Sequence, residues 1–442
     1  MKRYRYPMSH NWDTTQDIGN IVPTFAQYVT PLDTWSGNQV TVGRMSPMNK
    51  PVFGDFYHDQ FLFYVPLQAI WNENALSGYG DFRDAIVDNS VGTFPTASVS
   101  RSKGSATDLH SYFGVGHRGA AQSAETISLL FVMAYNHIWN KMFMNENTQS
   151  AVALNTNAIK QANHKGQSYL AMVQSDIELG AAVTVDTSGS TLGVDAIQDS
   201  IRESRYKQIL EKYGTEYEDL LKLHGINPSS LAREEVQLVA RNSTTVGVSE
   251  VMVTATSASE NSGEYVGHGI AINKMNVRPR LYIDYGILMG LSVLRPRLVL
   301  KNKIDRQYLI ADTEKFYHRF FNNRSHVNTA AREFCSITSD AQRAAVIGYS
   351  EYYGYLRRCS DVVAGEYLDA DTWDAQLLAK EAGTDAGSND SLANVMNVSK
   401  SDYDYLFQDS TEPHMFTHCM NRIGKKTQIP PYRGFTTMEV SQ

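Results

Sequence analysis

Three groups of residues in this sequence have types and spacing that could do chemistry. The first is Asp55, His58 and Asp59, because carboxylate and imidazole groups are common metal ligands. Beside a strand, however, such side chains more often bond to the backbone of a loop. The sequence therefore does not predict a metal site at these three residues.

The second group is a glycine-rich stretch at residues 114–119, GVGHRG, which has the spacing G-x-G-x-x-G. That spacing holds the pyrophosphate of a dinucleotide when a buried strand precedes it and an acid follows about 20 residues later. Here the preceding residues are polar, and no acid stands near position 139. A glycine-rich turn is favoured over a cofactor site.

The third group consists of basic residues interleaved with aromatic or apolar ones. Cations suit phosphates and aromatic faces suit unstacked bases, so such stretches are candidate contacts to single-stranded DNA. The alternatives are a disordered terminus for residues 2–6, and a solvated loop or ion pairs between subunits for the cluster around residue 300. The candidates are Lys2, Arg3, Tyr4, Arg5, Tyr6, Arg295, Arg297, Lys301, Lys425 and Lys426.

Catalytic motifs are lacking in the sequence. No serine stands in a G-x-S-x-G frame. The three cysteines, Cys335, Cys359 and Cys419, are far apart and form no C-x-x-C pair, which favours reduced thiols over a zinc site or a disulfide framework. We therefore expect no enzyme activity, no cofactor and no metal.

The stretch that must position much of the rest is Asp55–Trp71, DFYHDQFLFYVPLQAIW. Its apolar run Phe61–Val65 predicts a strand buried on both faces, because a half-exposed strand would alternate with polar residues. Pro66 lacks a backbone donor and should end the strand. One face then needs a second sheet, and the other needs loops or neighbouring subunits to cover it.

Other elements follow from hydrophobic periodicity. Residues 123–143 have apolar side chains at helical spacing, with Ser123 as a candidate N-cap, and residues 194–223 predict a second helix. Short strands and turns are expected between Ile18 and Val42. Further strands are expected at residues 246–256 and 281–300.

Composition limits the possible classes of protein. The 442 residues contain no long Pro, Ser or Gly linker, so one domain over 1–442 is expected, with its longest insertions around 72–122 and 144–245. The net charge of -7 argues against an overall basic nucleic-acid binder but not against a local basic face. Interfaces between proteins are enriched in Tyr, Met and Trp, and the chain has 25, 15 and 5 of these. No signal peptide or membrane span is predicted.

Residues 9–71 resemble the amino-terminal signature of the major capsid proteins of microviruses, in particular the gokushovirus-like ones. These are small tailless phages with circular single-stranded DNA. The matching residues are Pro31, Asp33, Trp35, Arg44, Pro47, Phe61, Phe63, Val65, Pro66 and Trp71. Two later motifs of the family match at Tyr135, Asn136, Trp139 and Asn140, and at Gly348, Tyr349, Tyr355 and Arg357.

The resemblance implies a mainly β fold, a single viral jelly roll in which an eight-stranded antiparallel barrel has long loop insertions containing several helices. It implies a structural protein of the virion, assembled in the host cytoplasm as sixty copies in a T=1 icosahedral shell. The implied partners are other copies of the chain, the packaged single-stranded DNA, a small basic internal protein, a minor DNA-delivery protein and a host surface receptor, with no membrane. The alternative is a non-viral jelly-roll protein that binds carbohydrate through exposed Trp and Tyr.

Overall fold

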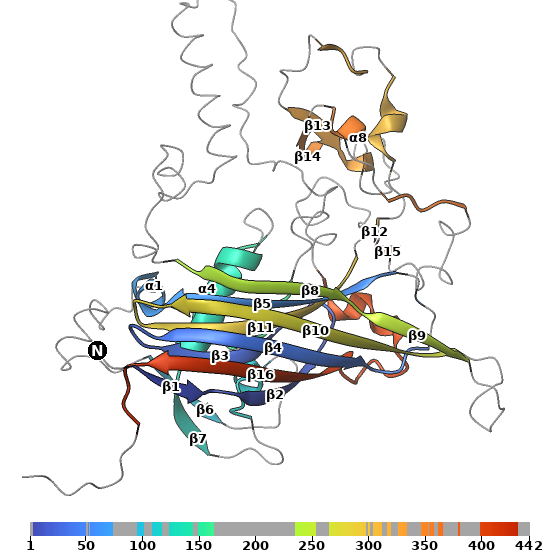
Figure 1. Ribbon diagram of the computed structural model, residues 1–442. Coiled ribbons are helices and arrows are strands. Elements are labelled where there is room, and N and C mark those ends of the chain that lie inside the picture. The colour runs from blue at the N-terminus through green and yellow to red at the C-terminus, as the bar shows by residue number, and fades with distance from the viewer. Residues whose placement is uncertain are drawn as a thin grey trace, which may run out of the picture. The chain divides into compact units, whose positions relative to one another are not determined.

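Two antiparallel sheets packed face to face form the centre of the structure (Figure 1). This computed structural model describes residues 3–49, 52, 54–73, 95–100, 108–116, 123–144, 149–162, 235–252, 265–297, 299–300, 304–311, 316–319, 326–333, 346–351, 353–357, 361–365, 379–380 and 398–431. The chain divides into two compact units, and the elements below belong to the unit built from residues 1–175 and 236–442. The other unit, residues 176–235, lies almost wholly outside the described residues.

The first sheet has six strands in the order β1-β16-β4-β10-β9, with β2 also paired to β16. Its strands are β1 (Tyr4–Pro7), β2 (His10–Gln16), β4 (Thr34–Met45), β9 (Gly247–Met252), β10 (Tyr265–Leu281) and β16 (Met415–Thr427). The second sheet has four strands in the order β3-β11-β5-β8. These are β3 (Ile21–Val29), β5 (Phe56–Pro66), β8 (Gln237–Thr245) and β11 (Gly286–Pro296).

The path of the chain between the sheets is that of a jelly roll. Strands β2, β3, β4, β5, β8, β10, β11 and β16 form two four-stranded halves, β2-β16-β4-β10 and β3-β11-β5-β8. The chain changes sheet at every step of this series except from β5 to β8. The sequence prediction of a mainly β, antiparallel jelly roll with eight core strands is confirmed.

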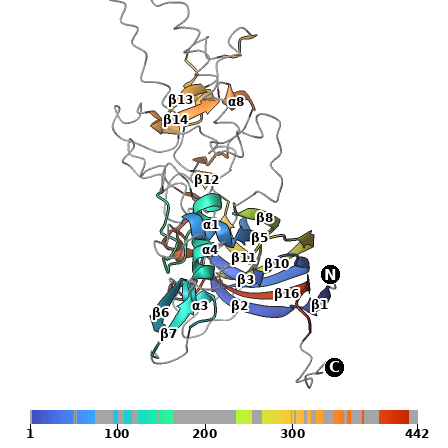
Figure 2. The ribbon, with the colours of Figure 1, turned by 90° about the vertical axis from the view of Figure 1, so that its left-hand side faces the viewer.

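The prediction that the strand at Phe61–Val65 is buried on both faces is also confirmed. Leu62 and Tyr64 belong to a cluster between the two sheets, and Phe63 and Val65 to a cluster with α1 (Leu67–Glu73) and α4 (Leu130–Ile138). Figure 2 shows these helices on one side of the sandwich and β16 on the opposite side. The helices of an insertion therefore cover the outer face of the four-stranded sheet.

A layer of buried polar side chains crosses the space between the sheets. His58 bonds to Ser292 (Nε2 to Oγ, 2.8 Å), Asn273 donates to the carbonyl of His58 (2.7 Å), and Gln60 donates to Thr41. The exposed fraction of each of these side chains is 0%. The layer separates an apolar cluster around Met45 and Phe56 from another around Phe25 and Trp35.

The helix expected from Ser123 begins only at Leu130. Residues Ala124–Ser128 form β7, which pairs with β6 (Thr96–Ser100), so Ser123 is not an N-cap. A strand partner from elsewhere in the chain outweighs the local helical spacing here, as tertiary context commonly does. After α4 the helix continues as a π-helical turn, Trp139–Phe143, so its end agrees with the prediction.

Several strands were missed or placed imperfectly by the sequence analysis. No strand was expected at β10 or β16, and β8 lies inside the stretch 144–245 that was assigned to an insertion. The expected strands at 281–300 are confirmed as β11 and β12 (Val299–Leu300), and β9 lies within the strand expected at 246–256. The helix expected at 194–223 lies outside the described residues.

Smaller elements occupy the later insertion and the glycine-rich turn. They are α3 (Leu109–Tyr112), η2 (Arg306–Leu309), β13 (His326–Ala330), η5 (Ala331–Glu333), β14 (Val346–Glu351), α8 (Gly354–Arg357), β15 (Ala379–Lys380), η7 (Lys400–Asp402) and η8 (Asp404–Leu406). Gly114 follows α3 with φ 82°, a left-handed conformation that suits the beginning of the expected turn, whereas residues 117–119 lie outside the described residues. Within the described part of the chain, no helix has the length and hydropathy needed to span a membrane.

Acid should destabilise the fold through His58. Burial lowers the pKa of His58 from 6.5 to about 4, against a smaller opposite effect of Asp59. The unfolded chain therefore binds this proton first, so the contribution to stability is complete above pH 6.5 and is lost toward pH 4. Between pH 7 and pH 5 the loss in unfolding free energy is about 2 kcal/mol, at ~1.36 kcal/mol per pKa unit.

Urea unfolding at both pH values checks this prediction. His58→Gln should reduce the pH dependence, whereas the control His268→Gln, at a half-buried position on β10, should leave it unchanged. An identical pH dependence in the wild type and both variants would contradict the assignment.

Candidate nucleic-acid interface

The two terminal basic stretches meet in the structure, although 423 residues separate Arg3 from Lys426 in the sequence. Strand β1 pairs antiparallel with the end of β16, which places Arg5 opposite Lys426 and Tyr6 opposite Lys425. We call Arg3, Arg5, Lys425 and Lys426 the basic corner. The alternative of a disordered terminus is wrong for residues 4–6, which form a paired strand.

Lys425 is a buried structural cation. Its ammonium lies 2.7 Å from Asp33 Oδ2 and 5.4 Å from the centre of the Trp35 ring. Its side chain is 10% exposed and that of Asp33 is fully buried. Asp33 also accepts a hydrogen bond from the amide of Thr30 (2.8 Å), which closes the turn before β4. Lys425 is thus poorly placed to bind a phosphate.

Arg3 and Tyr6 hold the two termini together. The Arg3 guanidinium donates to the carbonyls of Leu32 and Lys426 and to the Thr34 hydroxyl. The Tyr6 hydroxyl donates to the carbonyl of Ile429 (2.9 Å). Because the Arg3 guanidinium and the Tyr6 hydroxyl already donate to acceptors within the chain, their main role is structural.

Arg5 and Lys426 remain exposed on the basic corner. They stand directly opposite each other on paired strands, where like charges repel. An anion such as a phosphate would remove this repulsion. Of the terminal candidates, this pair therefore suits a nucleic-acid contact best. Lys2 lies outside the described residues.

The internal candidates have carboxylate partners. Arg295 on β11 pairs with Asp59 and lies over the ring of Tyr57, and Arg297 bonds to both carboxylate oxygens of Asp361 (2.9 and 3.0 Å). Both arginines therefore form ion pairs within the chain, whereas the alternatives expected from the sequence were a solvated loop or ion pairs between subunits. Lys301 lies outside the described residues.

The three residues considered as metal ligands, Asp55, His58 and Asp59, each contact a different partner. His58 contacts Ser292 in the core, Asp59 pairs with Arg295, and Asp55 lies 4.0 Å from Arg297. Within the described residues, no group of three or more His, Cys, Asp or Glu side chains could hold a metal ion. Cys419 is a free, buried thiol, whereas Cys335 and Cys359 lie outside those residues.

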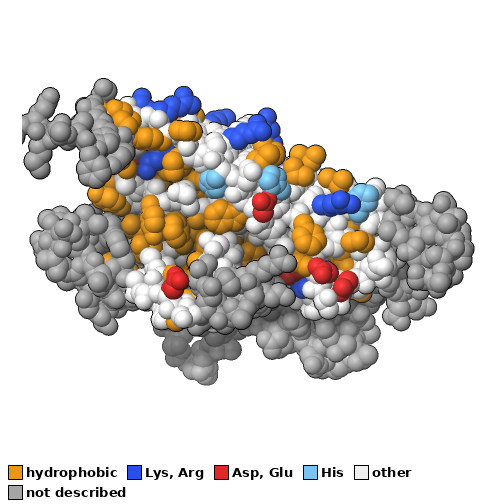
Figure 3. Space-filling model, turned by 90° about the horizontal axis from the view of Figure 1, so that it is seen from below, with side chains coloured by type: hydrophobic (Ala, Val, Ile, Leu, Met, Phe, Trp, Pro, Cys, Tyr) orange, Lys and Arg blue, Asp and Glu red, His pale blue; other side chains and the backbone are white. Residues whose placement is uncertain are grey.

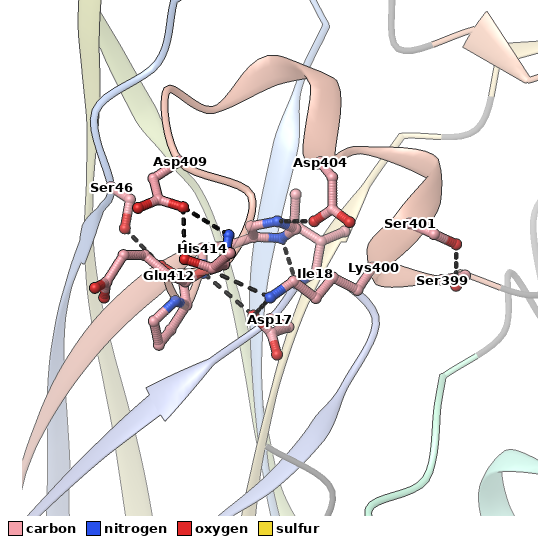
Figure 4. Close-up of polar contacts among 12 residues, drawn as sticks. Asp17, Ile18, Ser46, Ser399, Lys400, Ser401, Asp404, Asp409, Glu412 and His414 are labelled. Carbon is pink, nitrogen blue, oxygen red and sulfur yellow. Dashed lines mark hydrogen bonds and ion pairs between the residues drawn. The ribbon is translucent and has the colours of Figure 1, made fainter. Parts of the chain in front are cut away.

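A second cluster of charged side chains lies where residues 398–414 meet the turn between β2 and β3 (Figure 4). His414 Nε2 bonds to Asp404 Oδ1 (2.9 Å), His414 Nδ1 accepts from the amide of Ile18 (3.2 Å), and Lys400 lies 3.4 Å from Asp17. Burial lowers the pKa of His414, which keeps the imidazole neutral near pH 7. Both ring nitrogens of His414 have partners in the protein, so the arrangement fastens this segment.

The motif at residues 135–140 is a clamp on the backbone of residues 152–161. Asn136 donates to the carbonyls of Leu154 (2.8 Å) and Thr156 (2.9 Å). Asn140 both donates to and accepts from the backbone of Val152, each at 2.9 Å. The Tyr135 hydroxyl accepts from the amide of Lys160, and the Trp139 indole donates to the carbonyl of Gln161. These residues therefore have a structural role.

The other motif residues also contribute to packing and turns. Phe61 and Phe63 contact Phe143 edge to face, and Trp71 is buried in the same cluster. The carbonyl of Pro47 accepts from the amide of Gln408. Among the other motif residues, Pro66 ends β5, Gly348 and Tyr349 lie on β14, and Tyr355 and Arg357 lie on α8.

Besides the candidates Arg5 and Lys426, the six-stranded sheet carries exposed cations that were not among the candidates. They include Arg278, Lys274 and Arg422, and Arg44 was named only as a motif residue. The signal in the sequence was the lack of acids rather than a run of bases, since β4, β10 and β16 contain no Asp or Glu.

Comparison with known proteins gives two matches. A family model described as "Capsid protein (F protein)" matches residues 1–177 and 167–436, which is nearly the whole chain. Capsid protein VP1 of Chlamydia phage 1 is 24% identical over 156 residues. That match covers 34% of this chain and 26% of the relative, so the chain spans about a quarter of the relative's length.

Replacing Lys425 should destabilise the protein far more than replacing its neighbour. Lys425→Met leaves Asp33 buried without a cation and should lower the free energy of unfolding by about 3 kcal/mol. Lys426→Met, at an exposed position, should change it by less than about 0.5 kcal/mol. Urea unfolding of both variants measures the difference, and equal small effects would show that Lys425 is not a structural cation.

The clamp can be tested in the same way at Asn136. Asn136→Ala leaves two carbonyls without their donor and should lower the free energy of unfolding by about 2 kcal/mol. Hydrogen exchange at the Lys160 amide should become faster, since residues 152–161 are then less restrained. Asn276→Ala, at an exposed position on β10, is the control. Unchanged exchange in the Asn136 variant would refute the clamp.

Proposed function

Because the chain belongs to the F capsid protein family, the major capsid proteins of microviruses, we propose that sixty copies of it form a T=1 icosahedral shell around a circular single-stranded DNA genome. The observation that carries this proposal is the family match over nearly the whole chain. As a capsid protein, the chain is a structural constituent of the virion. The family match favours this proposal over the non-viral carbohydrate-binding alternative.

Association between copies is the proposed mechanism. Large apolar side chains stand exposed on the described part of the insertion between β11 and β16, including Tyr308, Phe316, Tyr317 and Val362. The centres of protein interfaces are enriched in aromatic side chains of this kind, which bury much area on contact. Many such contacts, each repeated by the symmetry of the shell, would give a closed particle whose stability is collective.

The charge of the subunit requires a further partner. A shell of subunits with net charge -7 does not neutralise the phosphates of the genome. We therefore include a small basic internal protein, or small cations, among the contents of the particle. A minor protein for DNA delivery, a host surface receptor and assembly in the host cytoplasm complete the proposal.

Particles purified from cells that make the full chain together with circular single-stranded DNA test the shell. Electron microscopy should show shells of a single diameter, and native mass measurement should give a protein mass near sixty times 49.5 kDa. A chain that stays monomeric at high concentration, with the DNA open to nuclease, would contradict the proposal.

The same particles test the charge argument. Their composition should include a basic protein, polyamines or divalent ions, and removal of these cations should release the DNA or open the shell. Filled particles that contain none of them, and that survive exhaustive dialysis, would refute this part of the proposal.

A further inference from the structure

The two outer faces of the sandwich differ in what covers them. The outer face of the four-stranded sheet lies under α1 and α4 in one apolar cluster. The outer face of the six-stranded sheet instead carries exposed side chains of β4, β10 and β16, among them Arg44, Ile272 and Phe416. We call the outward side chains of these three strands the open face.

The open face is basic in a chain that is acidic overall. Strands β4, β10 and β16 contain no Asp or Glu, although the chain has 47 acids and 40 bases. The exposed cations of this face are Arg44, Lys274, Arg278, Arg422 and Lys426. Among the described residues, none of these five forms an ion pair. The acids of the sheet stand on its other strands, as Asp13 on β2, paired with His418, and as Glu250 on β9.

Strand register places these cations next to apolar side chains. Arg44 lies between Phe416 and Ile270 in one row across the sheet. Two residues earlier on β4, the next row of side chains on the same face joins His418, Val42 and Ile272. The exposed fractions of Phe416, Ile270 and Ile272 are 49%, 46% and 63%. Further along, Lys274 lies opposite Val40 and Arg422 opposite Asn38. Figure 3 shows Lys and Arg side chains among hydrophobic ones along the upper rim of the view.

We infer that the open face is the surface of the subunit that lies against the packaged single-stranded DNA, an inference that rests on the proposed function. Cations meet phosphates, and exposed aromatic and aliphatic side chains meet unstacked bases, which only a single strand offers. The exposed pair Arg5 and Lys426 continues the same sheet at its β1 edge. A second copy of this face, or a basic internal protein, would bring cations against cations, which disfavours both as occupants.

The effect on DNA binding of removing two cations from the open face can be compared with the effect of removing two cations elsewhere. The face variant is Lys274→Gln with Arg422→Gln, and the control is Arg241→Gln with Arg319→Gln, whose cations are exposed outside the six-stranded sheet. Binding of the full-length, unassembled chain to a fluorescent oligothymidylate is measured by anisotropy over a range of salt concentrations. The slope of log affinity against log salt is negative, and the face variant should reduce its magnitude by about 1.4, at ~0.7 for each lost phosphate contact. The control should keep the wild-type slope.

A second pair of variants tests the apolar part of the face. Phe416→Ala should weaken binding of the oligothymidylate about tenfold, as loss of one stacked base does, and should leave binding of a duplex unchanged. Phe316→Ala, at a residue 62% exposed in the insertion, is the control. Equal losses in the face and control variants, or no loss in either, would overturn the assignment.

Purified particles separate this inference from the proposed function. Particles of the face variant should contain less DNA per protein than wild-type particles, as measured by ultraviolet absorbance. Full DNA content in that variant would overturn the assignment of the face alone, whereas a wild-type chain that forms no particles would contradict the proposed function. A face variant that binds the oligothymidylate like the wild type but forms no shell would assign the open face to contacts between subunits instead.

Discussion

The pairing of β16 with strands from the beginning of the chain is the constraint on which the rest of the structure depends. One edge of β16 pairs with β4, and its other edge pairs with β2 and β1. The six-stranded sheet therefore cannot form until the chain has returned through both of its long insertions. The same pairing brings Lys425 to Asp33 and places His414 against the amide of Ile18. These buried contacts hold the amino-terminal and carboxy-terminal segments of the chain together.

The sandwich has one covered face and one open face, and this asymmetry suits a subunit of a shell. Insertion helices bury the apolar side chains of β5 and β11, so that sheet is completed within a single chain. The six-stranded sheet keeps cations and apolar side chains exposed. The polar layer around His58, Gln60 and Asn273 lies between the sheets, where each side chain needs a specific partner. Such a layer favours one relative placement of the sheets over others, because a shift would leave buried polar groups unpaired.

The motif residues that point to the capsid family act mainly on the fold. Asn136 and Asn140 replace missing backbone partners along residues 152–161, which have no regular structure of their own. Asp33 and Trp35 receive Lys425. A motif can thus identify a family through residues whose observed contacts lie within the fold. The chemistry of the exposed surface depends mostly on side chains outside these motifs, which only the assembled sheet brings together.

Local pattern in the sequence was enough to predict the buried strand at Phe61–Val65 and the end of the helix at Phe143, because each depends on neighbours a few residues away. It was also enough to indicate the family and, through it, the jelly roll. Only the tertiary structure decided that Ala124–Ser128 is a strand, because its partner β6 is supplied by a distant segment. Only the tertiary structure distinguished the environment of Lys425 from that of Lys426. The two lysines are adjacent in the sequence, but successive side chains of a strand point to opposite faces, so one is buried beside Asp33 and the other is exposed.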